Sequence, residues 1–429
     1  MAVTQMATNN AQVQACRDML QTLLGDLQPR DFAVRFWDGT VWEPQNGESR
    51  FSLVLRHPGA LRRMYWPPKR GSLFEAYAYG DFEIEGDFES FLVFSKHMRE
   101  QPRSLMDKLR LGARLYRLPK HDWPRPNWKP PQMRGAFRSL ERDQQAVDYH
   151  YSMSNDFFAL FLDSRMVYTC AYFKTPEDDL ETAQTQKLDH ICRKLRLRPG
   201  DRLLDMGCGW GALAIHAATH YGARVLALNI SKPQVEWANA RVRKEGLGDR
   251  CRFELRDYRL VQEPGAFDKV VAAGLLEHVG ESMTVYFKKA WDQLKPGGVF
   301  LSHGIGMNYH EPMPRRPGFI QRYVFPDGEL LPISKNLRFA ELVGFEVRDV
   351  ECFRDHYVLT LRHWLRTLEA RAEEAKRITD EVTYRIYRLY LAASAAGFRT
   401  GVLHHYQTLL VKPDRGVSGL PLTRADWYA

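Results

Sequence analysis

A strand-to-helix turn is predicted by the stretch Leu203-Leu204-Asp205-Met206-Gly207-Cys208-Gly209-Trp210-Gly211-Ala212-Leu213. An apolar run ends at an acidic residue, glycines then alternate with other residues, and helix-forming residues follow. Such glycines permit a tight turn and allow the backbone to come close to a ligand. The helix that follows directs its unpaired N–H groups toward that ligand. Dinucleotide-binding folds use the spacing G-x-G-x-x-G at this point. This chain has G-x-G-x-G after Asp205, so it does not match that fingerprint.

Strands and helices alternate around this turn. Strands are predicted at residues 202–206, 224–230, 251–255, 268–273 and 299–303, and helices at 212–221, 232–245 and 284–294. This alternation predicts a mostly parallel sheet that is covered on both faces. Ligands of such sheets bind outside the carboxyl ends of the strands. The polar residues predicted near those ends are Asp205, Asn229, Asp257, Glu277 and His303. The sequence therefore predicts an enzyme site at this edge of the sheet.

Composition restricts the class of protein. The 429 residues are enough for two domains, and 44% hydrophobic with 26% charged residues is ordinary for a globular protein. No run of 18 apolar residues predicts a spanning helix, and the first fifteen residues show no secretory signal. The six cysteines are scattered without a C-x-x-C pair, which predicts no metal site, no disulfide framework and a cytosolic location. The net charge of +9 suits an anionic membrane, and no nucleic-acid module is recognisable.

The first 98 residues are predicted to form a small α+β domain. Apolar residues at helical spacing predict a helix at 11–27, short strands are predicted at 32–37 and 51–55, and a further helix at 88–98. Residues 99–145 are basic and rich in proline, which predicts a linker between domains. Basic residues mixed with Trp and Leu also favour contact with an anionic lipid surface. Both interpretations of this segment remain open at this stage.

The chain changes character again on both sides of the predicted sheet. Residues 150–163 and 166–173 are dense in aromatic residues, as expected for an apolar pocket with a few polar groups. After His303 the alternation stops, with a loop at 312–317, helical stretches at about 357–378 and 383–396, and a last strand near 403–411. These later elements are predicted to form a cap over the binding edge of the sheet.

Several segments together resemble one family, the cyclopropane-fatty-acyl-phospholipid synthases and their mycolic-acid-modifying relatives. The matching segments are His150–Asp156, Tyr168–Phe173, Leu204–Gly211, Leu276–Gly280, His303–Gly306, Arg322–Glu329 and His356–Leu361. The resemblance covers roughly residues 146–412, and its glycine turn is similar to the first motif of class I methyltransferases. It implies a Rossmann-like, mostly parallel seven-stranded sheet with a helical cap in residues 146–429. The N-terminal 145 residues match less strongly, mainly through His57-Pro58-Gly59 and Glu75–Gly80. They look like the lipid-binding domain of two-domain members, which the resemblance places in residues 1–98.

The resemblance also implies an activity. The family transfers the methyl group of S-adenosylmethionine to a cis double bond of an unsaturated phospholipid chain, and a cyclopropane ring closes after proton loss. A weak alkene nucleophile requires close positioning, and the carbocation that forms requires an apolar site closed to water. Aromatic faces can stabilise this cation. The implied setting is cytoplasmic, at the inner face of the plasma membrane and in contact with anionic lipid; a homodimer is compatible with the resemblance.

Specific residues correspond to the family's functional positions. The proton acceptor is implied to be a bound bicarbonate ion, held by Cys170, Glu277, His303, Ile305 and Tyr357. The residues implied to bind S-adenosylmethionine are Tyr168, Thr169, Asp205, Gly207, Gly209, Gly211, Asn229, Ser231, Gln234, Asp257 and Tyr258. One position departs from the pattern. Many class I methyltransferases carry an acid after the second strand and close relatives carry Thr, but this chain has Asn229.

Two other functions remain open from the sequence. The same scaffold in some relatives forms a methylene- or methyl-branched acyl chain, and the bicarbonate residues do not separate this product from a cyclopropane. A non-catalytic lipid-binding protein could also retain the fold. The presence of Glu277, His303 and Tyr357 argues against that second alternative, because a protein that only binds lipid has no need of them.

Overall fold

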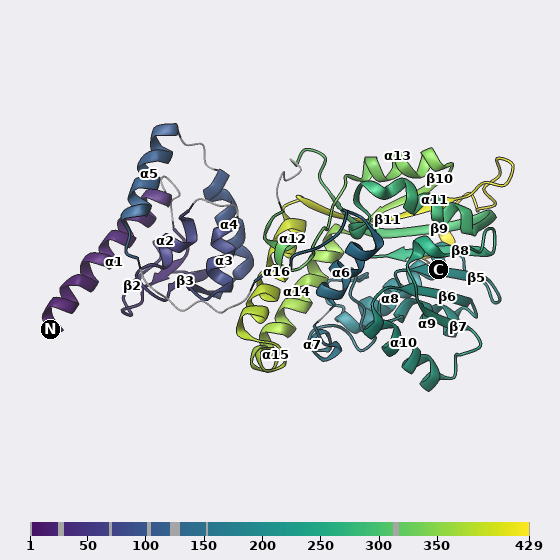
Figure 1. Ribbon diagram of the computed structural model, residues 1–429, viewed down its shortest axis with the longest axis horizontal. Coiled ribbons are helices and arrows are strands. Elements are labelled where there is room, and N and C mark those ends of the chain that lie inside the picture. The colour runs from purple at the N-terminus through teal and green to yellow at the C-terminus, as the bar shows by residue number, and fades with distance from the viewer. Residues whose placement is uncertain are drawn as a thin grey trace. The chain divides into compact units, whose positions relative to one another are not determined.

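The computed structural model describes residues 2–24, 30–67, 71–100, 104–120, 129–151, 153–311 and 317–428. The chain divides into two compact units, shown in Figure 1. Unit 1 comprises Met1–Pro130, Arg315–Val324 and Thr379–Ala396, and unit 2 comprises Pro131–Pro314, Phe325–Ile378 and Gly397–Ala429. Two later segments of the sequence therefore belong to the same unit as the N-terminal residues. No helix among the described residues is both long and apolar enough to cross a bilayer.

Unit 1 contains a four-stranded sheet in the order β2-β1-β3-β4. Its strands are β1 (Ala33–Arg35), β2 (Val41–Trp42), β3 (Phe51–Leu55) and β4 (Phe82–Gly86). Alternate residues of β3 are buried, as the two-residue period of a half-buried strand requires. The ring of Phe51 stacks on Phe32 at 4.9 Å between centroids and meets Phe91 edge-on at 5.7 Å. An aromatic core thus holds the sheet against α4, which carries Phe91.

The helices of unit 1 come from both ends of the chain. They are α1 (Ala2–Leu24), α2 (Ala60–Tyr65), α3 (Ser72–Ala78), α4 (Phe88–Glu100), α5 (Leu105–Arg117), α12 (Phe319–Tyr323) and most of α16 (Glu381–Arg399). Buried Arg385 of α16 donates to the backbone oxygen of Tyr77 at 2.9 Å, and Arg322 of α12 pairs with Glu75 at 2.8 Å. Part of the segment that was expected to cap the sheet of residues 146–429 therefore packs with the N-terminal residues.

The basic segment 99–145 contains more regular structure than its composition suggests. Helix α5 begins after Ser104, whose side chain accepts a hydrogen bond from the Asp107 N–H at 3.1 Å. Helix α6 (Leu140–His150) begins after Ser139 in the same way. Both helices fall inside or at the end of the predicted linker. The tryptophans and prolines of residues 121–128 lie outside the described residues.

Unit 2 is built on a seven-stranded sheet in the order β10-β11-β9-β8-β5-β6-β7. Its strands are β5 (Arg202–Met206), β6 (Arg224–Asn229), β7 (Cys251–Leu255), β8 (Phe267–Ala273), β9 (Leu294–Met307), β10 (Glu346–Cys352) and β11 (Leu403–Val411). Strands β5 to β9 pair in parallel, whereas β11 pairs antiparallel with both β9 and β10. This confirms the prediction of a mostly parallel seven-stranded sheet.

Alternate residues of each strand support opposite faces of the sheet. Leu203 belongs to one buried cluster, together with residues of α8 (Leu180–Leu195), α9 (Ala212–His220) and α10 (Lys232–Glu245). Leu204 belongs to the second cluster, with residues of α11 (Met283–Gln293) and α13 (Ile333–Val343). Helices therefore cover both faces, and only the strand ends remain open to a ligand. The remaining helices of this unit are α7 (Asn155–Ala159), α14 (Arg354–Ala370) and α15 (Ala372–Ile378).

Candidate active site

The glycine turn after β5 has the conformation that only glycine adopts without strain. The φ angles are +83° at Gly207, +54° at Gly209 and +85° at Gly211. A Cβ atom at Gly211 would lie 2.5 Å from Cζ of Phe253, so this glycine is required by packing. A Cβ atom at Gly209 would meet nothing within 4 Å. Gly209 therefore borders open space, and it is there that a ligand can approach the backbone.

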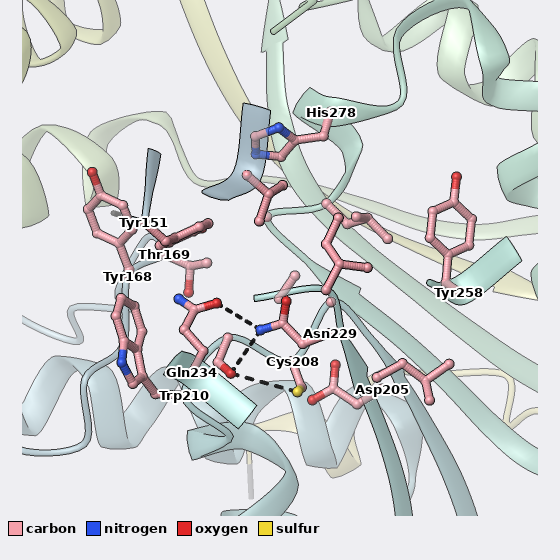
Figure 2. A pocket seen from close by; sticks show the side chains of 18 of the residues that line it. Tyr151, Tyr168, Thr169, Asp205, Cys208, Trp210, Asn229, Gln234, Tyr258 and His278 are labelled. Atoms are coloured by element: carbon pink, nitrogen blue, oxygen red, sulfur yellow. Dashed lines mark hydrogen bonds between the residues drawn. The ribbon is translucent and has the colours of Figure 1, made fainter. Parts of the chain in front are cut away.

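A cavity of about 150 Å³ lies against this turn. The residues predicted to bind cofactor that line it are Tyr168, Thr169, Asp205, Gly207, Gly209, Asn229, Gln234, Asp257 and Tyr258. Gly211 and Ser231 do not line the cavity. Figure 2 shows Tyr151, Tyr168 and Trp210 gathered on one side of it, apart from Tyr258. The structure thus brings most of the predicted cofactor set to one place.

Asn229 supports its neighbours in this structure. Its amide Nδ2 donates to the backbone oxygen of Gly209 at 3.1 Å and to Oε1 of Gln234 at 2.7 Å, as drawn in Figure 2. Its Oδ1 accepts from the Ser231 N–H at 3.1 Å. Both amide hydrogens are therefore already used within the protein. Gln234, whose Nε2 has no partner among the described residues, is therefore the amide donor available to a ligand in the cavity.

A buried lysine, Lys187, also lines the cavity, and the sequence did not single it out. Lys187 of α8 is 2% exposed, and its Nζ donates to Oγ1 of Thr169 at 2.8 Å. Burial lowers the pKa of Lys187 to about 8, although the charge of Asp163 and that of Asp205 oppose this shift. Burial also raises the pKa of Asp205 to about 7, and Lys187 opposes that shift. An acid and a base that both titrate near neutrality therefore border the same cavity.

Asp257 is held by an arginine that also contacts α6. Nε and Nη2 of Arg259 donate to the two oxygens of Asp257 at 2.9 and 2.7 Å. Nη1 of the same arginine lies 3.0 Å from Oδ2 of Asp143. Asp257 is thus a neutralised, fixed carboxylate, and Arg259 connects it to helix α6, whose residues line the cavity.

Ion pairs fix α6 over the cavity. Arg138, just before the helix, pairs with Glu329 at 2.7 Å and donates to the backbone oxygen of His278. Arg142 makes a two-point contact with Asp327, at 2.5 and 3.0 Å. Burial, reinforced by Arg138, lowers the pKa of His278 to about 4, so this lining residue is neutral at neutral pH. Sequence patterns gave no signal for these pairs, because their partners are far apart in the chain.

Glu277 faces β9. It lies in a short 3-10 turn (Leu276–His278) after β8, and its Oε1 accepts a hydrogen bond from the Ile305 N–H at 2.7 Å. Its Oε2 has no hydrogen-bond partner among the described residues. Burial raises the pKa of Glu277 to about 7, although the Ile305 N–H opposes this shift. Ile305, which the resemblance implies as a bicarbonate-binding residue, therefore has its N–H bonded to Glu277 in this structure.

The other members of the predicted bicarbonate set surround two aromatic residues. His303 is 0% exposed and lies 4.2 Å from His405 and 5.5 Å from Phe353, measured between ring centroids. Tyr357 meets His405 edge-on at 5.1 Å, and Sγ of Cys170 lies 3.7 Å from the backbone oxygen of Phe353. None of the five predicted residues lines the cofactor cavity. Cys170, His303 and Tyr357 are buried around His405 and Phe353, which were not anticipated. Half-buried Ile305 pairs with His405 across the two strands and donates to Glu277, which is also half-buried. We call these residues the second cluster.

The charge state of this second cluster is governed by burial. Burial lowers the pKa of His303 well below its usual value, and neighbouring His405 adds to the effect. Burial also lowers the pKa of His405, to about 3. Within the described part of the chain neither ring nitrogen of His303 has a hydrogen-bond partner. Buried polar groups are normally paired, so a neutral His303 can still bind a small polar guest.

The cavity fits the cofactor that the glycine turn suggests. Oδ2 of Asp205 and Nε2 of Gln234 are buried and have no partner among the residues that the structure describes. Oδ2 of Asp205 can accept a hydrogen bond from an ammonium group, and Nε2 of Gln234 can donate one to a hydroxyl group. A ligand that carries both groups matches this pair. The aromatic wall supplies apolar surface for a ring and aromatic faces for a sulfonium group. These residues fit S-adenosylmethionine.

The fold and this site together define a class I methyltransferase. The family model described as "Mycolic acid cyclopropane synthetase" matches residues 138–408. The chain belongs to that family, which confirms the resemblance seen in its motifs. It is an S-adenosylmethionine-dependent methyltransferase of a family that acts on lipid acyl chains.

Two of the similar proteins cover most of this chain, and a solved structure covers about three fifths of it. A "Probable fatty acid methyltransferase" of Pseudomonas putida is 37% identical over 92% of this chain and 95% of its own length. The "Cyclopropane-fatty-acyl-phospholipid synthase" of Escherichia coli K12 is 33% identical over 88% of this chain and 92% of its own. The crystal structure of the mycolic acid cyclopropane synthase CmaA1 with SAH and CTAB is 33% identical, with a TM-score of 0.59 over 62% of this chain and 97% of that one.

Proposed function

We propose that this protein methylates the cis double bond of unsaturated acyl chains in membrane phospholipids and closes a cyclopropane ring. The observation that carries this proposal is the second cluster, where Glu277 and His303 retain polar atoms without partners. A methyltransferase that acts on oxygen or nitrogen does not need a base that takes a proton from the transferred methyl group. An alkene substrate does, because a proton must leave the delivered carbon before the ring can close.

The residues around the cavity hold the cofactor, which supplies an electrophilic methyl group when bound. Asp205 and the turn at Gly207 and Gly209 receive its methionine end, with Tyr168 and Thr169 beside them. Gln234 donates to its ribose, while Asn229 keeps Gln234 and the glycine turn in position. Asp257 and Tyr258 flank the adenine. Gly211 and Ser231 contribute by packing and by the start of α10, since neither lines the cavity.

The second cluster holds the proton acceptor, a bicarbonate ion. Neutral His303 donates one hydrogen bond to this anion, and the Tyr357 hydroxyl donates another. Glu277 accepts from the hydroxyl of bicarbonate through Oε2, while Ile305 fixes Oε1. Cys170 supplies a thiol kept neutral by burial, which raises its pKa well above the usual value. A thiol in this state is a weak donor rather than a nucleophile.

The lipid environment completes the proposal. Residues 146–429 carry the chemistry, residues 1–98 bind lipid, and residues 99–145 join the two parts and contact an anionic bilayer. The enzyme then works peripherally, at the cytoplasmic face of the plasma membrane. The buried, aromatic surroundings of Phe353 and Tyr357 exclude water, which would otherwise trap a carbocation on the acyl chain.

Product analysis tests this function. The enzyme is incubated with S-adenosylmethionine labelled in its methyl group and vesicles of an unsaturated phospholipid, and the product lipid is examined by NMR. Cyclopropane methylene signals support the proposal. Signals of a methylene- or methyl-branched chain would support the alternative, which the name of the Pseudomonas putida relative favours. Label that stays out of the lipid would overturn both.

A further inference from the structure

Helix α5 of unit 1 exposes an apolar stripe. Leu105 is 75% exposed, Met106 58%, Leu109 61% and Tyr116 55%. Positions 105, 109 and 116 lie within about 40° of one another around an α-helix, with 106 adjacent to them. Leu115, which is buried in the unit, lies about 100° around the helix from the centre of these three positions. A stripe of this size is unusual on an exposed helix, where large apolar residues normally occur singly.

A basic flank runs beside this stripe. Arg110, Arg114 and Arg117 follow one another at spacings of four and three residues, which places them on one side of the helix. Arg114 donates to Oγ1 of Thr22 at 2.9 Å. Among the described residues, Arg110 and Arg117 have no ion-pair partner. The helix thus presents apolar side chains next to unneutralised positive charge.

Helix α5 is joined firmly to the rest of unit 1. Nη1 of Arg62 donates to the backbone oxygens of Tyr116 and Leu118 at 2.6 and 3.1 Å. The ring of Tyr116 also meets Trp66 edge-on at 5.8 Å between centroids. The end of α5 is therefore fixed to α2 and the residue after it. Helix α5 is therefore an integral part of the folded unit.

We propose that α5 lies in the interface of an anionic phospholipid bilayer, with Leu105, Met106 and Leu109 among the acyl chains. Arg110 and Arg117 contact the lipid phosphates at the edge of the stripe. This inference rests on the proposed lipid-methylating function and assigns its membrane contact to one helix. Charge complementarity selects an anionic bilayer, because a helix with an apolar face and arginines beside it binds such interfaces.

Vesicle binding tests the apolar stripe. The variant Leu105→Gln with Leu109→Gln is compared with wild type by co-flotation with phosphatidylcholine–phosphatidylglycerol vesicles. We expect its binding to weaken about tenfold or more, since two large side chains no longer enter the acyl region. The matched control is Leu342→Gln with Leu422→Gln, two exposed leucines of unit 2, which should bind like wild type. Equal binding by the stripe variant and the control would overturn the proposal.

A second comparison tests the basic flank. Arg110→Gln with Arg117→Gln should weaken binding to the same vesicles, and added salt should reduce the difference from wild type. Binding to phosphatidylcholine alone should change little. The charge-matched control is Arg243→Gln with Lys244→Gln at the end of α10, which should retain wild-type affinity. A loss of affinity as large in this control would assign the effect to net charge and overturn the role of α5.

Three further measurements distinguish membrane contact by α5 from contact between copies of the chain and from failure of the proposed function. Hydrogen exchange of wild-type α5 should slow when anionic vesicles are added, and unchanged exchange would contradict the proposal without any substitution.

Light scattering without lipid should give the same mass for wild type and the stripe variant. A lower mass for the variant would identify the stripe as a contact between copies of the chain. Methylation of phospholipid in detergent micelles should survive the stripe substitutions. If wild type methylates phospholipid in neither micelles nor vesicles, the proposed function fails while the vesicle-binding result still stands.

Discussion

The backbone N–H of Ile305 donates a 2.7 Å hydrogen bond to Oε1 of Glu277 and leaves Oε2 of the same carboxyl group without a partner among the described residues. One oxygen is therefore fixed to β9 and the other is available. The same strand carries His303, two residues earlier, and the Gly274 N–H donates to its backbone oxygen at 2.9 Å. The turn after β8 and the strand β9 are thus bonded to each other at Glu277 and at His303, the two residues that we propose bind the proton acceptor.

Glu277→Gln should strongly reduce lipid methylation while leaving S-adenosylmethionine binding nearly unchanged. Gln can still accept from Ile305, but its amide presents a donor where Oε2 presents an acceptor. Losing the group that positions the proton acceptor should cost on the order of 10²–10⁴ in rate. Turnover with labelled cofactor and binding calorimetry measure the two effects separately.

The control for this change is Glu236→Gln, an exposed glutamate of α10 paired only with Lys232 among the described residues. It should leave turnover unchanged. Excess bicarbonate should restore part of the Glu277→Gln activity if the defect is weak anion binding. Wild-type turnover in a folded Glu277→Gln protein would remove Glu277 from the catalytic set.

The stability of the protein should depend on Glu277 with a definite sign. Burial raises its pKa from the ordinary value of 4.5 to about 7. Between these values the folded protein binds more protons than the unfolded chain, so the free energy of unfolding falls as pH rises through this window. Glu277→Gln removes this dependence. The variant should therefore gain stability relative to wild type, on the order of 1–3 kcal/mol, between about pH 4.5 and about pH 8.

Thermal unfolding of wild type and Glu277→Gln at several pH values measures this relative change. All other titrating groups are common to both proteins, so they cancel in the difference. The matched Glu236→Gln protein should show no such trend, because its carboxyl group is exposed. A difference between wild type and Glu277→Gln that does not vary with pH would show that Glu277 ionises freely in the folded state.

The sheet of unit 2 was predictable wherever local signals are strong. Strands β5, β7 and β11 and helix α10 have the bounds that periodicity predicted. Helix α10 shows why, with Pro233 in its first turn and Gly246 in the left-handed conformation at its end. Strand β10 was missed because its sequence Glu-Val-Arg-Asp-Val-Glu-Cys is largely charged, as an edge strand tolerates.

The missed site residues depend on tertiary structure. Lys187 comes directly after polar residues in an amphipathic helix, so its sequence position does not indicate burial. It is buried because α8 packs against the sheet. His405 lies on a strand whose antiparallel pairing sets it opposite Ile305, a relationship between residues 100 positions apart. Helix α5 was hidden because composition described residues 99–145 as a whole. Pattern and motif reasoning identifies the glycine turn, but not the groups that burial brings beside it.

Gly209 and Gly211 should respond differently to substitution although they are two residues apart. A side chain at Gly209 projects into the space beside the cavity, so Gly209→Val should abolish S-adenosylmethionine binding. A methyl group at Gly211 would collide with Phe253 in the core, so Gly211→Ala should lower the melting temperature. Each change also costs about 1–2 kcal/mol for a left-handed residue.

Calorimetry and thermal unfolding of both variants test this contrast. The left-handed cost of alanine is common to Gly211→Ala and Gly200→Ala, so the difference in melting temperature between these two variants reports the collision with Phe253. Gly200→Ala is a suitable control, because that glycine is also left-handed and has no neighbour within 4 Å of an added Cβ. Retained cofactor binding in a folded Gly209→Val protein would contradict the assignment of the cavity.

Lys187 should control the pH at which the cofactor binds. Asp205 can accept from the cofactor's ammonium group only as a carboxylate, and burial raises its pKa to about 7. Affinity for S-adenosylmethionine should therefore rise as pH increases through about 7. Lys187→Met removes the positive charge that favours ionised Asp205, so the rise should move to higher pH. Calorimetric titrations from about pH 6 to about pH 9 measure this shift.

The control is Lys289→Met, which should keep the wild-type profile. Lys289 is partly buried, donates to the backbone oxygen of Val261 and does not line the cavity. A profile for Lys187→Met identical to wild type would show that Lys187 serves packing and its bond to Thr169, and not the ionisation of Asp205.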